Sequence, residues 1–188
     1  MSDFNSLKSH FLIAMPSLQD PNFVQGVALL CEHNEEGAMG IVINHPLSIT
    51  TSELFDHLEI PLETSLMEQE GSVMAGGPVQ TDRGFVVHRT GQLWQSSLDI
   101  SEQITITTSP DILVSMAQNG GPAEAFIALG YAGWGPGQLE QEITDNSWLC
   151  VPADADIIFN TKVEERWQKA IELLGISSAQ ISTTVGHA

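Results

Sequence analysis

Cys31 and His33 are the side chains of this sequence whose types and spacing come closest to a catalytic pair. They lie two residues apart in the apolar segment 26–33, which is typical of a β-strand, so both side chains are expected on one face. A thiol beside an imidazole can act as a nucleophile with its general base, and the two can also ligate a metal ion. The apolar neighbours 28–30 favour the alternative of a buried, unreactive thiol.

The other histidines form no recognisable metal motif. His45, His57 and His88 are isolated in the sequence, and no second ligand stands at a zinc-like spacing from any of them. The sequence therefore predicts no metal site.

A glycine-rich segment, residues 129–142 (LGYAGWGPGQLEQE), lies between an expected strand and an expected helix, where nucleotide phosphates are often bound. It contains neither GxGxxG nor GK[ST]. Pro136 removes one backbone donor, and Glu140 and Glu142 would repel an anion at the start of the helix. The favoured interpretation is that the glycines allow a sharp turn and close packing, and no cofactor is predicted.

Arg83 is the cation with the clearest functional interpretation. It belongs to GGPVQTDRGFVVH, in which Gly76 to Pro78 are expected to form a turn before a strand. With four acids for every base in the chain, Arg83 is expected to pair with a structural carboxylate. The alternative is a guanidinium on a loop that recognises an anion.

Lys162, Arg166 and Lys169 are spaced by four and three residues on the last predicted helix, on the face opposite Trp167. Glu165 and Lys169 stand at a favourable spacing for an ion pair. This basic stripe is expected to contact the acidic body of the protein or solvent, and docking of a partner is the alternative.

A ligand pocket is expected where the loops that carry these motifs converge. The candidates to line it are polar or aromatic residues in or beside loops: Asn34, Asn44, Arg83, Tyr131, Trp134 and Asn146.

The segments that must position these residues alternate between strands and helices, which predicts an α/β (α+β) domain. Expected strands are 10–15, 26–33, 38–44, 72–75, 84–89, 93–100, 103–107, 123–130, 148–152 and 157–160. Expected helices are 52–58, opened by a capping box of Thr50 and Glu53, one that begins at Ser109 and Pro110, 138–145, and one that Thr161 and Glu164 cap and Gly175 ends. One domain over 1–175 is expected, followed by a loose tail at 176–188.

The composition is acidic throughout, with a net charge of −18 from 24 acids and 6 bases. Such a charge repels phosphate backbones, so direct binding to nucleic acid is not expected. The longest apolar stretch, 125–135, is shorter than the roughly 18 residues that span a bilayer, so no membrane association is expected. Two cysteines without a CxxC motif suit the reducing cytoplasm.

Several segments of the sequence together resemble the YqgE/AlgH family of bacterial proteins. They are, in order, FLIAMPSLQDPNF, CEHNEEGAMGIVINHPL, GGPVQTDRGFVVH, GYAGWGPGQLEQEITDNSWL and the pair Arg166–Trp167. The resemblance implies a compact fold whose split β-sheet curls into a pseudo-barrel flanked by helices. It implies no reaction and transfers no catalytic or binding residue, and the family's name suggests a role in transcriptional regulation.

The sequence contains no complete catalytic constellation, so the leading hypothesis is a non-catalytic cytoplasmic protein that binds a protein partner or a small ligand. One alternative is a small-molecule hydrolase or transferase that uses Cys31 and His33. A transcriptional regulator is the other.

Overall fold

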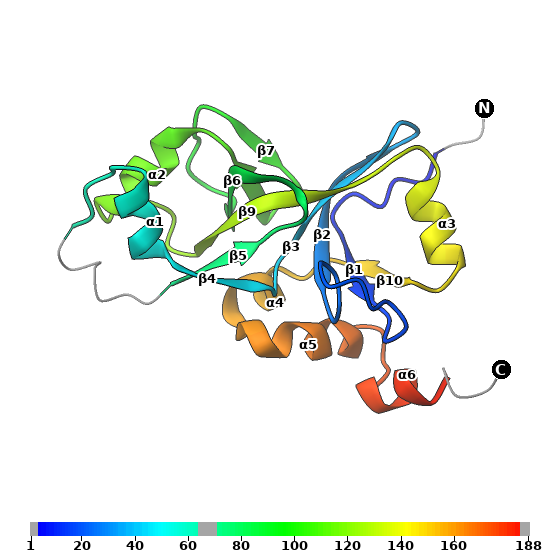
Figure 1. The fold of residues 1–188 in the computed structure, drawn as a ribbon. Helices are drawn as coiled ribbons and strands as arrows, with labels where there is room; N and C mark the ends of the chain where they lie inside the picture. The colour runs from blue at the N-terminus through cyan, green and yellow to red at the C-terminus, as the bar shows by residue number, and fades with distance from the viewer. Residues whose placement is uncertain (1–3, 64–70, 185–188) are drawn as a thin grey trace.

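A long central strand, β9 (Ala125–Trp134), connects the two parts of the fold in the computed structural model, which describes residues 4–63 and 71–184. Figure 1 shows β9 running from the part that holds α1 and α2 to the part that holds α3. The other strands are β1 (His10–Ala14), β2 (Val27–Asn34), β3 (Gly37–Val42), β4 (Pro46–Thr50), β5 (Ser72–Ala75), β6 (Val79–Arg89), β7 (Ser97–Asp99), β8 (Ile104–Thr107) and β10 (Trp148–Pro152).

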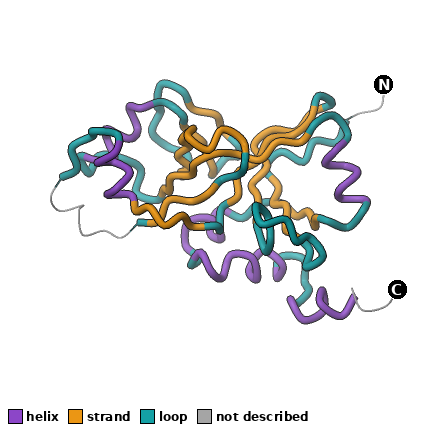
Figure 2. The backbone as a smooth tube through the Cα atoms, in the orientation of Figure 1, coloured by secondary structure: helices purple, strands orange, loops and turns teal. Residues whose placement is uncertain are grey.

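The helices surround this sheet, as Figure 2 shows with strands in orange at the centre and helices in purple outside. They are α1 (Thr51–His57), α2 (Pro110–Ala117), α3 (Gln138–Thr144), α4 (Ala155–Asn160), α5 (Arg166–Glu172) and α6 (Ser178–Thr184), and a 3₁₀ turn (Val163–Glu165) precedes α5.

The strands form one curled sheet in the order β10-β1-β2-β3-β9-β6-β8-β7, with β4 and β5 off this path. The pairs are antiparallel except β5 with β9, where Met74 lies opposite Ala128. Different lengths of β9 pair with β3 and with β6, so the sheet bends along this strand. The result is a single domain with a curled half-barrel sheet and several helices, as the resemblance implied.

Both faces of the sheet are buried near β1, because alternate side chains enter different cores. Phe11 and Ile13 belong to the core beneath α4 and α5, whereas Leu12 belongs to the core beneath α3. A strand that is buried on both faces has a continuous run of apolar residues, which explains why residues 10–15 show no alternation of polar and apolar side chains. A third core lies under α1 and α2.

The capping box of α1 is confirmed, since the Thr50 side chain accepts from the Glu53 amide and the Glu53 side chain accepts from the Thr50 amide. The expected strand at 157–160 is wrong, because Asp154 caps helix α4 there. Strand β4 was missed, and β9 continues to Trp134, past the expected end at 130.

The C-terminal region also differs from the expectation. Residues 163–165 form a 3₁₀ turn before α5, so the predicted single helix begins irregularly. Residues 178–184, expected within a loose tail, form helix α6. Ile181 is buried in the main core, which explains why this segment is helical and docked.

Candidate functional site

A groove of about 580 Å³ lies where β2 and β3 face β6, β8 and the segment before β7. Its polar lining residues are Glu32, Arg83, Gln95, Ser96, Ser97 and Thr108. Its apolar lining residues are Cys31, Met39, Phe85, Leu98, Ile106 and Tyr131. Apolar walls with a few polar groups are typical of ligand sites in proteins.

A β-bulge in β2 determines which side chains reach this groove. Leu30 pairs with Gly40, whereas Glu32 pairs with the adjacent Met39, so β2 has one extra residue at Cys31. The side chains of a strand normally alternate between the two faces of the sheet, and the bulge interrupts this alternation at Cys31. Cys31 and Glu32 therefore both line the groove although they are consecutive in the chain.

The same bulge separates Cys31 from His33, so the expectation that they share a face is wrong. The Cys31 thiol is 1% exposed in the main core and donates to the Leu29 carbonyl at 3.4 Å. Burial raises the pKa of this thiol far above its usual range, and the charge of Glu32 adds to the effect. Such an environment favours the protonated thiol over the thiolate, which is the nucleophilic form.

His33 has partners on the other side of the sheet. Its Nδ1 accepts a hydrogen bond from the Leu7 amide at 2.9 Å, so the ring proton lies on Nε2. That nitrogen lies 2.6 Å from a carboxylate oxygen of Glu140 on α3. His33 thus joins the N-terminal segment, β2 and α3.

Of the expected pocket residues, Arg83 and Tyr131 line this groove, whereas Asn34 and Trp134 line a smaller neighbouring hollow of about 220 Å³. The Arg83 guanidinium lies over the Phe85 ring, 5.2 Å from its centroid. The Phe85 and Tyr131 rings meet edge to face at 6.0 Å. Within residues 4–63 and 71–184, no carboxylate lies within 4.0 Å of Arg83, so the expected structural ion pair is not formed there.

Close backbone packing places Tyr131 in the groove. Gly77 has φ +156° and passes so near β9 that a Cβ atom would lie 2.1 Å from the Tyr131 carbonyl carbon. Gly130, with φ +78°, would similarly meet the Gly77 carbonyl oxygen at 2.4 Å. Gly77 and Gly130, one from each motif, thus allow close packing of backbone, in line with the interpretation favoured for the glycine-rich segment.

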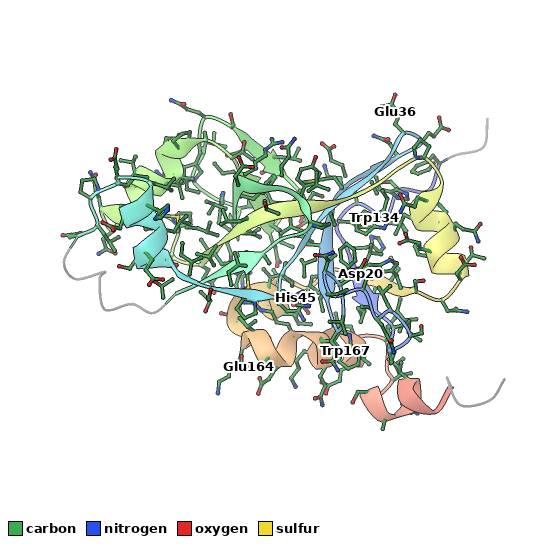
Figure 3. All side chains as sticks on the ribbon, in the orientation of Figure 1. Asp20, Glu36, His45, Trp134, Glu164 and Trp167 are labelled. Atoms are coloured by element: carbon green, nitrogen blue, oxygen red, sulfur yellow. The ribbon has the colours of Figure 1, made fainter. Side chains whose placement is uncertain are left out.

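Trp134 and Asn34 have structural contacts away from Arg83. The Trp134 indole is 6% exposed and donates to Glu142 of α3 at 2.9 Å. Figure 3 shows Trp134 between the sheet and α3, with Glu36 at the tip of the β2–β3 hairpin. The Asn34 side chain accepts from the Glu36 amide at 2.8 Å and shapes that hairpin.

Asn44 and Asn146 line neither the groove nor the neighbouring hollow. Asn44 accepts from the Val27 amide and donates to the Gln25 carbonyl, both at 2.8 Å, which fixes the entry into β2. Asn146 has φ +59° and lies in the turn after α3, where asparagine tolerates the left-handed conformation.

The predicted basic stripe is not a surface feature in the structure. Arg166 is 7% exposed, so it is buried rather than opposite the core. Lys169 pairs with Glu172 at 3.3 Å instead of Glu165. Lys162 is exposed.

Sequence reasoning missed Glu32, Gln95 and Ser96 as groove residues. Glu32 is a charged residue inside the apolar segment 26–33, and this contrast is a signal that could have identified it. The bulge that turns its side chain into the groove cannot be recognised from the sequence. Gln95 and Ser96 lie before β7 rather than in a strand that begins at 93, and no motif marks them.

No group of three or more His, Cys, Asp or Glu side chains that could hold a metal ion occurs within residues 4–63 and 71–184. No helix in that part of the chain combines the length and apolar character needed to cross a bilayer.

The fold and the groove define a single-domain α/β protein with a curled sheet and a groove of mixed polar and apolar lining beside its central strand. Residues 11–179 match the AlgH-like family model, and the chain belongs to that family. A UPF0301 protein of Pseudoalteromonas translucida is 52% identical over 183 residues, covering 97% of this chain and 99% of the relative. A UPF0301 protein of Thioalkalivibrio sulfidiphilus is 51% identical over 188 residues, covering all of both chains.

Solved structures show the same architecture. The solution structure of the AlgH protein from Pseudomonas aeruginosa has a TM-score of 0.79 and 46% identity, covering 100% of this chain and 99% of that one. A crystal structure of a Corynebacterium diphtheriae protein has a TM-score of 0.70 at 19% identity, covering 92% and 89%, which shows the fold alone.

Proposed function

We propose that this protein is a non-catalytic cytoplasmic binding protein whose groove recognises a small zwitterionic ligand of the amino-acid or short-peptide class. The observation that carries the proposal is that Arg83 and Glu32 line the same groove without pairing with each other. Opposite charges that share a cavity but stay unpaired are available to a ligand that carries both charges.

Each part of the groove has a counterpart in such a ligand. The planar Arg83 guanidinium suits a carboxylate, and stacking on Phe85 restricts its orientation before a ligand arrives. Glu32 suits an ammonium group. Phe85 and Tyr131 provide an apolar surface for the body of the ligand.

The negative charge of Glu32 in the same groove favours a zwitterion over a simple anion at this site. A protein with a net charge of −18 repels anions at long range, and Arg83 is the single cation among the described residues that line this groove. A ligand that also carries a positive charge avoids this repulsion and gains a contact with Glu32.

The alternatives receive less support. A hydrolase or transferase that uses Cys31 and His33 loses its geometric basis, because the bulge places the two side chains in different environments. A regulator that binds DNA directly would need several free cations on one surface. Arg166 is buried, and Arg89 and Lys169 are each paired with acids.

The test is titration calorimetry of the full chain with a panel of the common amino acids and their dipeptides. At least one member should bind, and Arg83→Met should weaken that binding at least about tenfold, since it removes the carboxylate partner. Glu32→Gln should weaken it by a similar factor. Lys162→Met is the matched control, because Lys162 is exposed and lies outside the groove.

The proposal fails if no member of the panel binds. It also fails if a bound member has the same affinity for the Arg83→Met variant as for the unchanged chain.

A further inference from the structure

Arg166, the first residue of α5, is a buried cation that the groove does not use. Its Nε donates to the Thr161 carbonyl at 3.3 Å, and its Nη1 donates to the Ile43 carbonyl. Its guanidinium lies over the Phe126 ring, 5.3 Å from the centroid. These contacts hold the side chain in place but supply no negative charge.

Arg166 has no close counter-ion in the part of the chain that the structure describes. No carboxylate of residues 4–63 or 71–184 lies within 4.0 Å of the guanidinium. Burial lowers the pKa of Arg166 to about 10, and the charge of Glu164 opposes this shift only in part. A buried charge without a partner is unfavourable, so an anion that reached it would gain an unusually strong contact.

Arg166 lines a cavity of about 390 Å³ at the junction of α1, β5, β9 and α5. The hydroxyl residues Ser52 and Ser72 also line it. Most other lining residues are apolar, among them Phe55, Leu62, Met74, Met116, Ile127 and Val163. The volume is within the roughly 300–1,000 Å³ of small-molecule sites.

We infer that this cavity is a second binding site, which takes a monocarboxylic acid with an apolar body. The carboxylate would contact the Arg166 guanidinium, and the apolar body would lie among Phe55, Met74 and Met116. A single guanidinium and an apolar wall suit one carboxylate better than a phosphate, which carries more charge and needs more donors. The site is independent of the Arg83 groove, since the two share no lining residue.

The probes that test this site are octanoate and octanol, which share an apolar chain but differ in charge. Calorimetry with the full chain should show binding of octanoate, and octanol should bind at least about tenfold more weakly because it cannot pair with Arg166. Equal affinity for the two probes would overturn the inference, as would no binding of octanoate.

Two variants test the location of octanoate binding without removing the Arg166 side chain. Ala125→Leu adds volume inside the cavity, because Ala125 lines it, and should abolish octanoate binding. Ala123→Leu is the matched control, since Ala123 is exposed and outside the cavity. Unchanged affinity in Ala125→Leu would overturn the inference.

Arg166→Lys keeps the positive charge but loses the planar fork, so octanoate should bind it at least about tenfold more weakly. Arg83→Met should leave octanoate binding unchanged, which separates this site from the groove. Residues 64–70 lie outside the described part of the chain and include Glu68 and Glu70. The inference would be overturned if the double variant Glu68→Gln/Glu70→Gln bound octanoate and the unchanged chain did not. That result would mean that the chain itself supplies the counter-ion of Arg166.

Discussion

Trp134 and Trp148 donate their indole hydrogens to the same carboxylate oxygen of Glu142, at 2.9 and 2.8 Å. Trp134 ends β9, Trp148 begins β10, and Glu142 lies on α3, so one carboxylate joins a helix to two strands. The two rings meet edge to face at 6.0 Å. The glutamate that sequence analysis considered as a source of anion repulsion is therefore a structural acceptor.

Glu142→Ala should lower the free energy of unfolding by about 2–4 kcal/mol, because it leaves two largely buried indole donors without an acceptor. Glu142→Gln keeps an acceptor and should cost about 1 kcal/mol. Urea unfolding followed by tryptophan fluorescence measures both. Glu35→Ala, at the exposed hairpin, is the control and should change the stability little; equal losses for Glu35→Ala and Glu142→Ala would contradict this role.

Gly77→Ala should destabilise the protein by about 2–4 kcal/mol, because a Cβ atom would collide with the Tyr131 backbone and the residue has φ +156°. Gly91→Ala should be neutral within about 0.5 kcal/mol, since nothing lies within 4 Å of its Cβ position. Thermal or urea unfolding of the two variants gives the comparison. A neutral Gly77→Ala variant would show that β9 and the turn at 76–78 do not pack as described.

Cys31 should be alkylated by iodoacetamide at least about 100-fold more slowly in the native protein than in concentrated urea at about pH 8, because burial raises its pKa. A Cys150→Ala background isolates the signal, since the Cys150 thiol, with a pKa raised to about 11 by burial, would otherwise contribute. Equal native and unfolded rates would restore Cys31 as a candidate nucleophile.

His88 should make stability depend on pH. Its side chain is 1% exposed, and burial lowers its pKa, although the Arg89 carbonyl and the charge of Asp99 oppose the shift. The unfolded chain therefore binds the proton more readily, with a pKa of about 6.5, so stability is complete above that pH and falls as the pH drops below it.

The expected loss approaches about 1.4 kcal/mol per pH unit until the folded-state pKa of His88 is reached. Urea unfolding between about pH 7.5 and pH 5 measures the slope. His88→Gln should flatten it, whereas His57→Gln, at an exposed position, should not. Identical slopes in both variants and the unchanged chain would contradict the buried neutral state of His88.

Most helices and strands could be predicted from the sequence, because capping residues and apolar runs lie within the elements that they define. The capping box of Thr50 and Glu53 and the apolar run 148–152 both correspond to observed elements. The segment 157–160 was misassigned because its apolar run is short, and Asp154, whose side chain caps the helix, was overlooked.

The candidate site was less predictable, because its geometry depends on long-range contacts. Arg83 and Tyr131 were identified from their residue types, and the pairing of β6 with β9 places both against Phe85. Trp134 and Asn44 were chosen by the same criterion, but Trp134 is held by Glu142 and Asn44 by backbone groups at the start of β2. The burial of Arg166 depends on the docking of α5 against the sheet, where its guanidinium donates to the carbonyl of Ile43, the residue after β3, and helical spacing could not indicate this contact.

We propose that Arg83 and Glu32 together bind one zwitterionic ligand in the groove. Heteronuclear NMR of the full chain, titrated with the tightest binder of the amino-acid and dipeptide panel, tests it most directly. We expect the largest chemical-shift changes at the Arg83 side chain and at the backbone amides of Glu32 and Tyr131. Chemical-shift changes confined to residues outside the groove, or no chemical-shift change at all, would contradict binding by Arg83 and Glu32.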